Sequence, residues 1–90
     1  MDFEYDAKKS ETNKIKHGID FEDAKAIWAD SEAIAVPSKY EGEDRSLVIG
    51  SVNDQLWTAI VTYREEVIRI ISVRRARKYE EQAYNNSRRT

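Results

Sequence analysis

The stretch that most constrains the fold is residues 66–78, which read Glu-Val-Ile-Arg-Ile-Ile-Ser-Val-Arg-Arg-Ala-Arg-Lys. Its β-branched residues favour a strand that is apolar on both faces, as a central strand of a sheet is. Arg69 interrupts this strand, and burying an unpaired charge is very unfavourable. Arg69 must therefore either pair with a carboxylate or reach an open site. More cations follow at once, where we expect the strand to turn into a helix: Arg74, Arg75, Arg77 and Lys78.

The remaining sequence predicts a small α+β domain. Helices are expected over residues 7–17, from Asp20 onwards, and over residues 74–85, and strands over residues 33–36, 45–52 and 56–63. The alternation around Phe3 and Tyr5 indicates either a short edge strand or an extended lead-in. Together these elements predict one domain over residues 1–90, with two N-terminal helices, a three- to four-stranded antiparallel sheet and a C-terminal helix.

Local signals mark the first two helices. Asp6 is a candidate N-cap, and Gly18 is a candidate C-terminal stop. Asp20 is placed to cap the second helix. The apolar residues that follow recur at helical spacing, which indicates a face packed on the core and not a ligand site: Phe21, Ala24, Ile27 and Trp28.

Composition excludes several classes of protein. The chain has no cysteine and one histidine, so a disulfide framework and a thiolate zinc site are ruled out, and we expect no metal or other cofactor. No apolar run approaches the length that spans a bilayer, so we expect a cytoplasmic protein without membrane contact. Residues 1–44 carry a net charge of −6 and residues 45–90 carry +4. Any polyanion should therefore meet the second half.

The groups best suited to chemistry are cations: Lys16, His17, Arg45, Arg64, Arg69, Arg74 and Arg75. Arg45 and Arg64 lie at the ends of paired strands that meet, with Arg69 along the next strand and Arg74 farther away. Such a cluster suits an anion whose charge is spread over several oxygens, such as a phosphodiester. The alternative is that these are exposed arginines that only keep a small domain soluble.

Two motifs resemble those of the BrnT family of toxins. The first comprises Phe3-Glu4-Tyr5-Asp6, Asn13 and Lys16-His17-Gly18-Ile19, followed by Phe21 and Ala24. The second is Arg69-Ile70-Ile71-Ser72-Val73-Arg74-Arg75-Ala76, with Arg45, Gly50 and Arg64 at the spacing expected between the motifs. The resemblance covers residues 3–84.

This resemblance implies a RelE-like ribonuclease that halts translation. It also implies a BrnA-like antitoxin with a ribbon-helix-helix DNA-binding domain, so that operator DNA would be bound only through the antitoxin.

The working hypothesis for the mechanism is metal-independent RNA cleavage, in which the 2′-hydroxyl attacks the adjacent phosphate. The candidate catalytic residues are Arg64, Arg69, Arg74, Lys16 and His17, and the candidate substrate-binding residues are Arg45, Arg75 and Tyr63. His17 is the side chain whose ordinary pKa suits proton transfer near neutrality, although a histidine at a helix end is also a common cap. The general base is left unassigned.

Two other functions are alternatives to ribonuclease activity, and one surface is expected to bind the antitoxin. A non-catalytic module could bind RNA or an acidic protein through the same basic surface, whereas a direct DNA binder is disfavoured because no helix-turn-helix is evident. The antitoxin is expected to contact the basic second half and the closing helix, through Arg75, Ala76, Tyr79, Ala83 and Tyr84.

Overall fold

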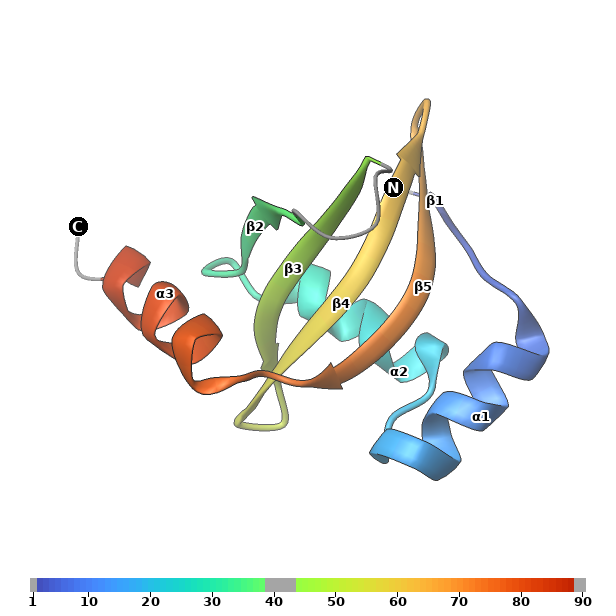
Figure 1. The fold of residues 1–90 in the computed structure, drawn as a ribbon, viewed down its shortest axis with the longest axis horizontal. Coiled ribbons are helices and arrows are strands. Elements are labelled where there is room, and N and C mark those ends of the chain that lie inside the picture. Colours follow the sequence, from blue (N-terminus) through green and yellow to red (C-terminus); the bar gives the residue numbers. More distant parts are fainter. Residues whose placement is uncertain (1, 39–43, 89–90) are drawn as a thin grey trace.

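The computed structural model describes residues 2–38 and 44–88, which form one mixed sheet with helices on both sides (Figure 1). The elements follow in the order β1 (Asp2–Glu4), α1 (Ala7–His17), α2 (Phe21–Ala24), the 3-10 helix η1 (Lys25–Ala29), β2 (Ile34–Pro37), β3 (Arg45–Val52), β4 (Gln55–Arg64), β5 (Val67–Arg75) and α3 (Lys78–Arg88). In the part of the chain described, no helix is long and apolar enough to cross a membrane.

The α+β class is confirmed, but the sheet has more strands than the three to four predicted, and it is mixed where a purely antiparallel sheet was expected. The sheet has five strands in the order β1-β5-β4-β3-β2, and β1 runs parallel to β5. The lead-in is therefore an edge strand, with Phe3 opposite Ile68. The opposite edge is β2, which includes Pro37, a residue that edge strands tolerate because they need not donate every backbone N–H.

The local helix signals are confirmed at both N-terminal helices. The Asp6 side chain accepts from the backbone N–H groups of Lys8 and Lys9, and Gly18 ends α1 in the left-handed conformation at φ 88°. The Asp20 side chain accepts from the N–H of Asp23. The second helix keeps α-helical geometry only to Ala24 and continues as η1.

The core lies between one face of the sheet and α1, α2 and η1. Phe21, Ala24 and Ile27 are fully buried there, while Trp28 packs against this core and stays partly exposed. Gly50 allows the close approach of η1 to β3, because a Cβ at this position would lie 2.9 Å from Ile27 Cγ2.

The three long strands form an antiparallel meander with one irregularity. Asn53 and Asp54 join β3 to β4, and both have positive φ, as a type I′ hairpin turn requires. The pairing of β4 with β5 shifts between Ile60 and Val61, which leaves Ile71 as an additional residue in β5. This bulge lies halfway along β5.

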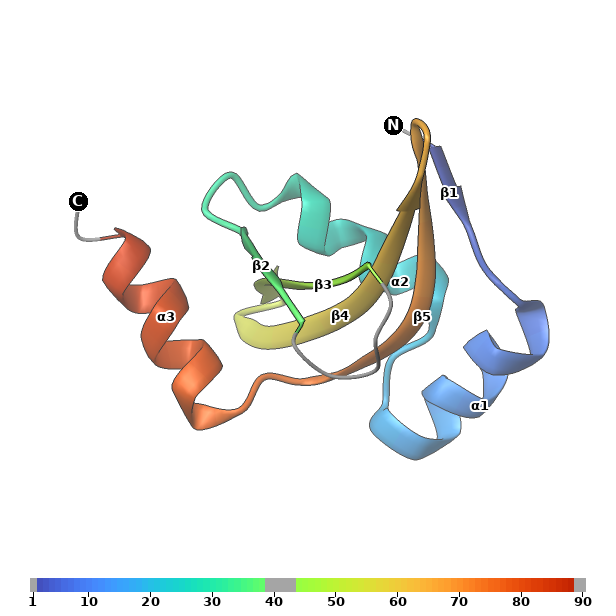
Figure 2. The same cartoon turned by 45° about the horizontal axis from the view of Figure 1, so that its top comes forward.

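The closing helix begins later than predicted. β5 continues to Arg75, which pairs with Trp57, and the N–H of Ala76 still donates to the carbonyl of Leu56. α3 therefore starts at Lys78 instead of Arg74. It stands at one end of the sheet, well away from α1 (Figure 2).

Candidate active site on the open sheet face

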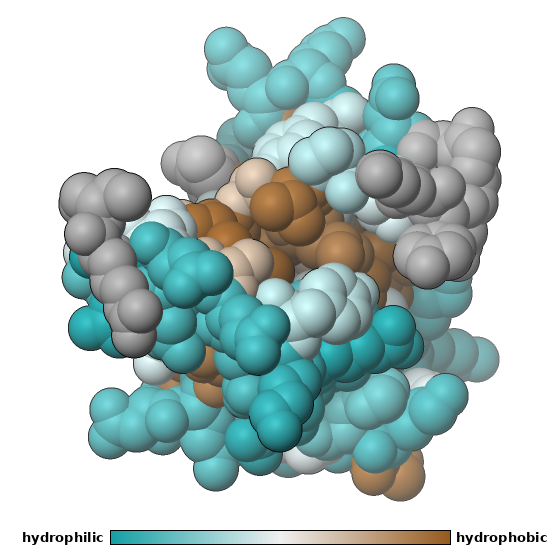
Figure 3. Space-filling view, turned by 60° about the vertical axis from the view of Figure 1, so that its left-hand side comes forward, coloured by the Kyte–Doolittle hydropathy of each residue, from teal (hydrophilic) through white to brown (hydrophobic). Residues whose placement is uncertain are grey.

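The face of the sheet away from α1 and α2 holds a groove of about 600 Å³. Its walls carry arginines and hydroxyl groups, and its floor is mainly apolar. The groove is lined by Ser38, Arg45, Leu47, Ile60, Ile71, Ser72, Arg74, Arg77 and Tyr79. In the space-filling view this side of the molecule shows an apolar hollow surrounded by hydrophilic side chains (Figure 3).

The strand register orders these side chains into rows, because neighbouring residues on paired strands share a face. One row places Thr62 between Arg45 and Arg69, whose backbones are about 10 Å apart, or two strand spacings. The next row contains Leu47 and Ile60, with Ser72 of β5 opposite Ile60.

A third row carries Arg74 and marks the far side of the groove. Arg74 is paired with Thr58, which also lies opposite Ile49 of β3. Thr58 and Ile49 are buried. The groove therefore runs across the strands, between the Arg45–Arg69 row and the start of α3.

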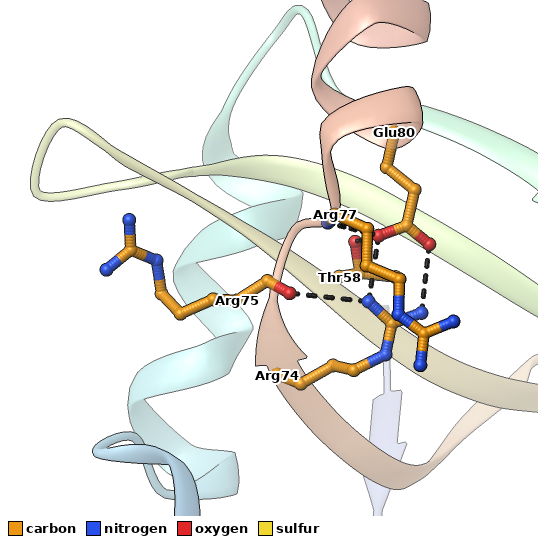
Figure 4. A network of polar contacts seen from close by, with 5 residues as sticks. All are labelled: Thr58, Arg74, Arg75, Arg77 and Glu80. Carbon is orange, nitrogen blue, oxygen red and sulfur yellow. Dashed lines mark hydrogen bonds and ion pairs between the residues drawn. The ribbon is translucent and has the colours of Figure 1, made fainter.

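Arg74 is held by a buried carboxylate at the start of α3 (Figure 4). Arg74 Nη1 and Nη2 donate to Glu80 Oε1 and Oε2 at 2.8 and 2.9 Å. Glu80 is 1% exposed, and it also accepts from the Thr58 hydroxyl and from the backbone N–H of Arg77. This last bond is half of a capping box, in which a glutamate at the third helical position closes the helix start.

The electrostatics of this network favour the ionised pair. Burial alone raises the pKa of Glu80, but the hydrogen bonds from Arg74, Arg77 and Thr58 outweigh it and lower the pKa to about 2. A guanidinium has five N–H donors, and the bonds to Glu80 and to the Arg75 carbonyl occupy three of them. Two donors of Arg74 are left to meet a ligand or the nearby Tyr79 hydroxyl.

Arg69 also finds a carboxylate, but close to the surface. Its Nη1 lies 2.9 Å from Glu4 Oε2, and the two side chains are 33% and 39% exposed. Of the two outcomes expected for Arg69, pairing with an acid is the one observed. Because Arg69 stays partly exposed beside Thr62, it can still contribute positive charge to the groove margin.

Lys16 and His17 line a second, smaller hollow of about 220 Å³ at the end of α1. This hollow shares Ile71 and Ser72 with the groove, so the two meet at the β5 bulge. Asn13 fixes α1 in this position, since its side-chain amide donates to the Val73 carbonyl at 2.8 Å and accepts from the Val73 N–H at 3.2 Å.

Three of the predicted site residues lie elsewhere. Arg64 is exposed at the distal end of β4, about 20 Å along the strand from the position opposite Arg74. Tyr63 is 50% exposed and lines a separate hollow with Asp2, Glu65 and Glu66. Arg75 lies 5.4 Å from the ring of Trp57 and points away from Arg74 (Figure 4).

The predicted partner surface on α3 is only partly available. Tyr84 is 4% exposed, and its hydroxyl donates to Asp30 Oδ2 at 2.7 Å, so Tyr84 has almost no surface to offer the antitoxin contact expected of it. Burial and the bond to Asp30 raise the pKa of Tyr84 to about 12. Ala76 and Ala83 are half-buried, whereas Tyr79 is 56% exposed.

Six lining residues were not predicted as site residues from the sequence, namely Ser38, Leu47, Ile60, Ile71, Ser72 and Arg77. Arg77 belongs to the basic run that was noted, but the expected helix from Arg74 obscured its position at the helix start. The alternation of Arg45 and Leu47 in β3 was a usable signal for the open face. Among the described residues, no group of three or more His, Asp or Glu side chains is placed to hold a metal ion.

Comparison with known proteins gives one positive finding. No curated protein matches the chain. The profile described as "Ribonuclease toxin, BrnT, of type II toxin-antitoxin system" matches residues 5–80, which include α1, the three long strands and the start of α3. The chain therefore belongs to the BrnT family of ribonuclease toxins of type II toxin–antitoxin systems.

Proposed function

We propose that this protein is a metal-independent endoribonuclease whose active site is the open sheet face. The observation that carries the proposal is the meeting of two cationic hollows at Ile71 and Ser72, one holding Arg45, Arg74 and Arg77, the other Lys16 and His17. The described groove lining contains arginines and hydroxyls and no carboxylate, which suits phosphate better than a divalent cation.

The proposed reaction is an internal transfer of the phosphate. The 2′-oxygen of RNA bonds to phosphorus and loses its proton, while the bond from phosphorus to the 5′-oxygen breaks and that oxygen takes up a proton. The products carry a 2′,3′-cyclic phosphate and a 5′-hydroxyl. DNA lacks the attacking hydroxyl and is not cleaved.

The residues divide into two groups by their position. Arg74 and Arg77, with Arg45 across the groove, would stabilise the charge that develops on the phosphate. Lys16 adds a cation from the α1 side, and His17 is the candidate for proton transfer. Arg69 would extend the same field along the groove margin, and Arg64 would meet RNA farther along the strand.

The family assignment suggests the wider role. A type II system implies an antitoxin, and we propose that it is a BrnA-like protein whose ribbon-helix-helix domain carries operator binding for the pair. Cleavage of RNA by the free toxin in the cytoplasm would then inhibit translation until the antitoxin binds.

The test is an incubation of the purified protein with a defined RNA, with and without EDTA, followed by analysis of the product ends. We expect cleavage in EDTA, with 2′,3′-cyclic phosphate and 5′-hydroxyl ends. Products with 5′-phosphates, or loss of cleavage on chelation, would contradict the mechanism.

One observation favours a second candidate, a non-catalytic RNA-binding module. Arg69 and Arg74 are each already neutralised by a glutamate, which reduces the charge available to stabilise a transition state. In that case the same RNA would be retained by the protein in a gel-shift measurement and recovered at full length.

A further inference from the structure

Among residues 2–38 and 44–88, the open face leaves a groove beside α3 that could take another element. α3 covers the row that contains Thr58, while the adjacent apolar row is left partly exposed. This row takes one apolar side chain from each of β2, β3 and β4, and at β5 it meets Ser72 and the bulge residue Ile71: Val36, Leu47, Ile60, Ile71 and Ser72. Because apolar side chains on a concave surface gain from being covered, the row indicates a docking surface for a protein segment.

The arginines on both sides of this row favour a segment with negative charge. Arg45 and Arg69 follow one side of it, and Arg74 and Arg77 follow the other. Arg77 is exposed, and Arg69 is one-third exposed. An occupant would therefore carry apolar residues on the face toward the sheet and carboxylates along both flanks.

The dimensions of the row favour a helix. Four strands at about 4.8 Å separation give a row of about 14 Å, which matches a helix of about ten residues. Successive turns of a helix, about 5.4 Å apart, would place one apolar side chain over each strand. A helix in this place would lie beside α3.

We propose that the antitoxin inserts an acidic amphipathic helix of about three turns into this groove, across β2 to β5 and alongside α3. The family assignment supplies the partner, and the charge and width of the groove supply its chemistry. The consequence for activity rests on the ribonuclease proposed above: the helix would cover Arg74 and Arg77 and exclude RNA. This placement uses Tyr79 at the groove wall and leaves the buried Tyr84 out of the interface.

The absence of cysteine allows a direct test. Leu47→Cys introduces a single thiol on the groove floor, and Tyr63→Cys introduces one on the opposite face of the sheet, where Tyr63 is 50% exposed. Each variant is alkylated with a maleimide, alone and as the purified complex with the protein encoded beside the toxin gene. We expect complex formation to slow the alkylation of Leu47→Cys at least tenfold relative to the toxin alone. The alkylation rate of Tyr63→Cys should change less than twofold.

A charge-reversal variant tests the arginines beside the apolar row independently of the cysteine at Leu47. Arg69→Glu with Arg77→Glu should weaken binding of the same neighbouring protein at least 100-fold, whereas the paired control Lys25→Glu with Arg88→Glu should change it less than threefold. Lys25 and Arg88 also form surface ion pairs, but they lie outside the groove. The control thus matches the charge change, and it removes two described ion pairs where the groove variant removes one, that of Arg69 with Glu4.

The outcomes separate this proposal from the proposed function. A complex that forms without shielding Leu47→Cys, or that shields Tyr63→Cys instead, overturns the docking site. Shielding of Leu47→Cys that grows with the concentration of the toxin alone overturns it in favour of self-association. If the neighbouring protein shields Leu47→Cys and the toxin does not cut RNA, the docking site is supported. That result contradicts only the proposed ribonuclease activity.

Discussion

Two arginine–glutamate pairs in this molecule have the same chemistry and different surroundings. Arg74 and Glu80 have side chains 18% and 1% exposed, and Glu80 has further hydrogen bonds to Thr58 and Arg77. Arg69 and Glu4 are joined by one bond between side chains that are each about one-third exposed. The first pair attaches α3 to the sheet, whereas the second lies at the junction of β1 and β5.

The contrast shows which arginine can be exchanged without loss of the fold. Removing one partner of a buried pair leaves an uncompensated charge, while exposed pairs contribute little because water screens them. Arg74 therefore has a structural role whatever else it does. Arg69 and the exposed Arg77 are the better probes of function.

The largest expected effect is from breaking the buried pair. Arg74→Ala should reduce the free energy of unfolding by about 3 kcal/mol, because Glu80 would keep its burial and lose its counter-charge. Urea unfolding followed by circular dichroism measures this difference. A loss below about 1 kcal/mol would show that water reaches Glu80, and the two pairs would then be equivalent.

Acid should weaken the same pair. The pKa of Glu80 is lowered from 4.5 to about 2, so the folded state binds the proton less well than the unfolded state. Stability from Glu80 is therefore complete above about pH 4.5 and is lost as the pH falls toward 2. Thermal unfolding between pH 5 and pH 2 should show this decline.

A conservative variant isolates the contribution of Glu80 to that decline. Glu80→Gln should make the loss of stability with acid shallower than in the parent. Some dependence will remain, because the hydrogen bonds of Asp30 and Glu22 also lower the pKa of those two carboxyls. Parallel curves for the parent and the variant would contradict the assignment.

The smallest effect on stability is expected at the exposed pair. Arg69→Ala should lower the free energy of unfolding by less than about 1 kcal/mol. Cleavage of RNA by this variant should fall by about 100-fold if Arg69 contributes to the groove. Unfolding with normal cleavage by the remaining folded protein would make Arg69 a purely structural residue.

The elements that the sequence predicted well are those with local signals. Asp6, Gly18 and Asp20 mark helix ends through bonds to residues two to four positions away. β3 starts and ends where the alternation predicted, and β4 is one residue longer at each end. The start of α3 was misplaced because its basic run has no Ser, Thr or Asp cap. Glu80 at the third helical position was the available signal.

The pairings across the chain could not be predicted in the same way. Glu4 and Arg69 are 65 residues apart, and their contact depends on the parallel pairing of β1 with β5. Most cations of the candidate site could be identified from the sequence by type. Which face of the sheet Arg74 takes, and which Arg75, could not be predicted, because the bulge at Ile71 changes the alternation along β5.

The most direct test of the central claim, that the open sheet face cleaves RNA, is the cleavage rate of the double variant Arg69→Ala with Arg77→Ala. Arg77 lines the groove, Arg69 lies in the row of strand residues on its other side, and Arg77→Ala keeps the backbone N–H that caps α3. The matched control is Lys25→Ala with Arg88→Ala, and circular dichroism confirms folding in each. We predict that the groove variant cleaves at least 100-fold more slowly than the parent, while the control stays within twofold. A folded groove variant that cleaves at the rate of the parent would contradict the account.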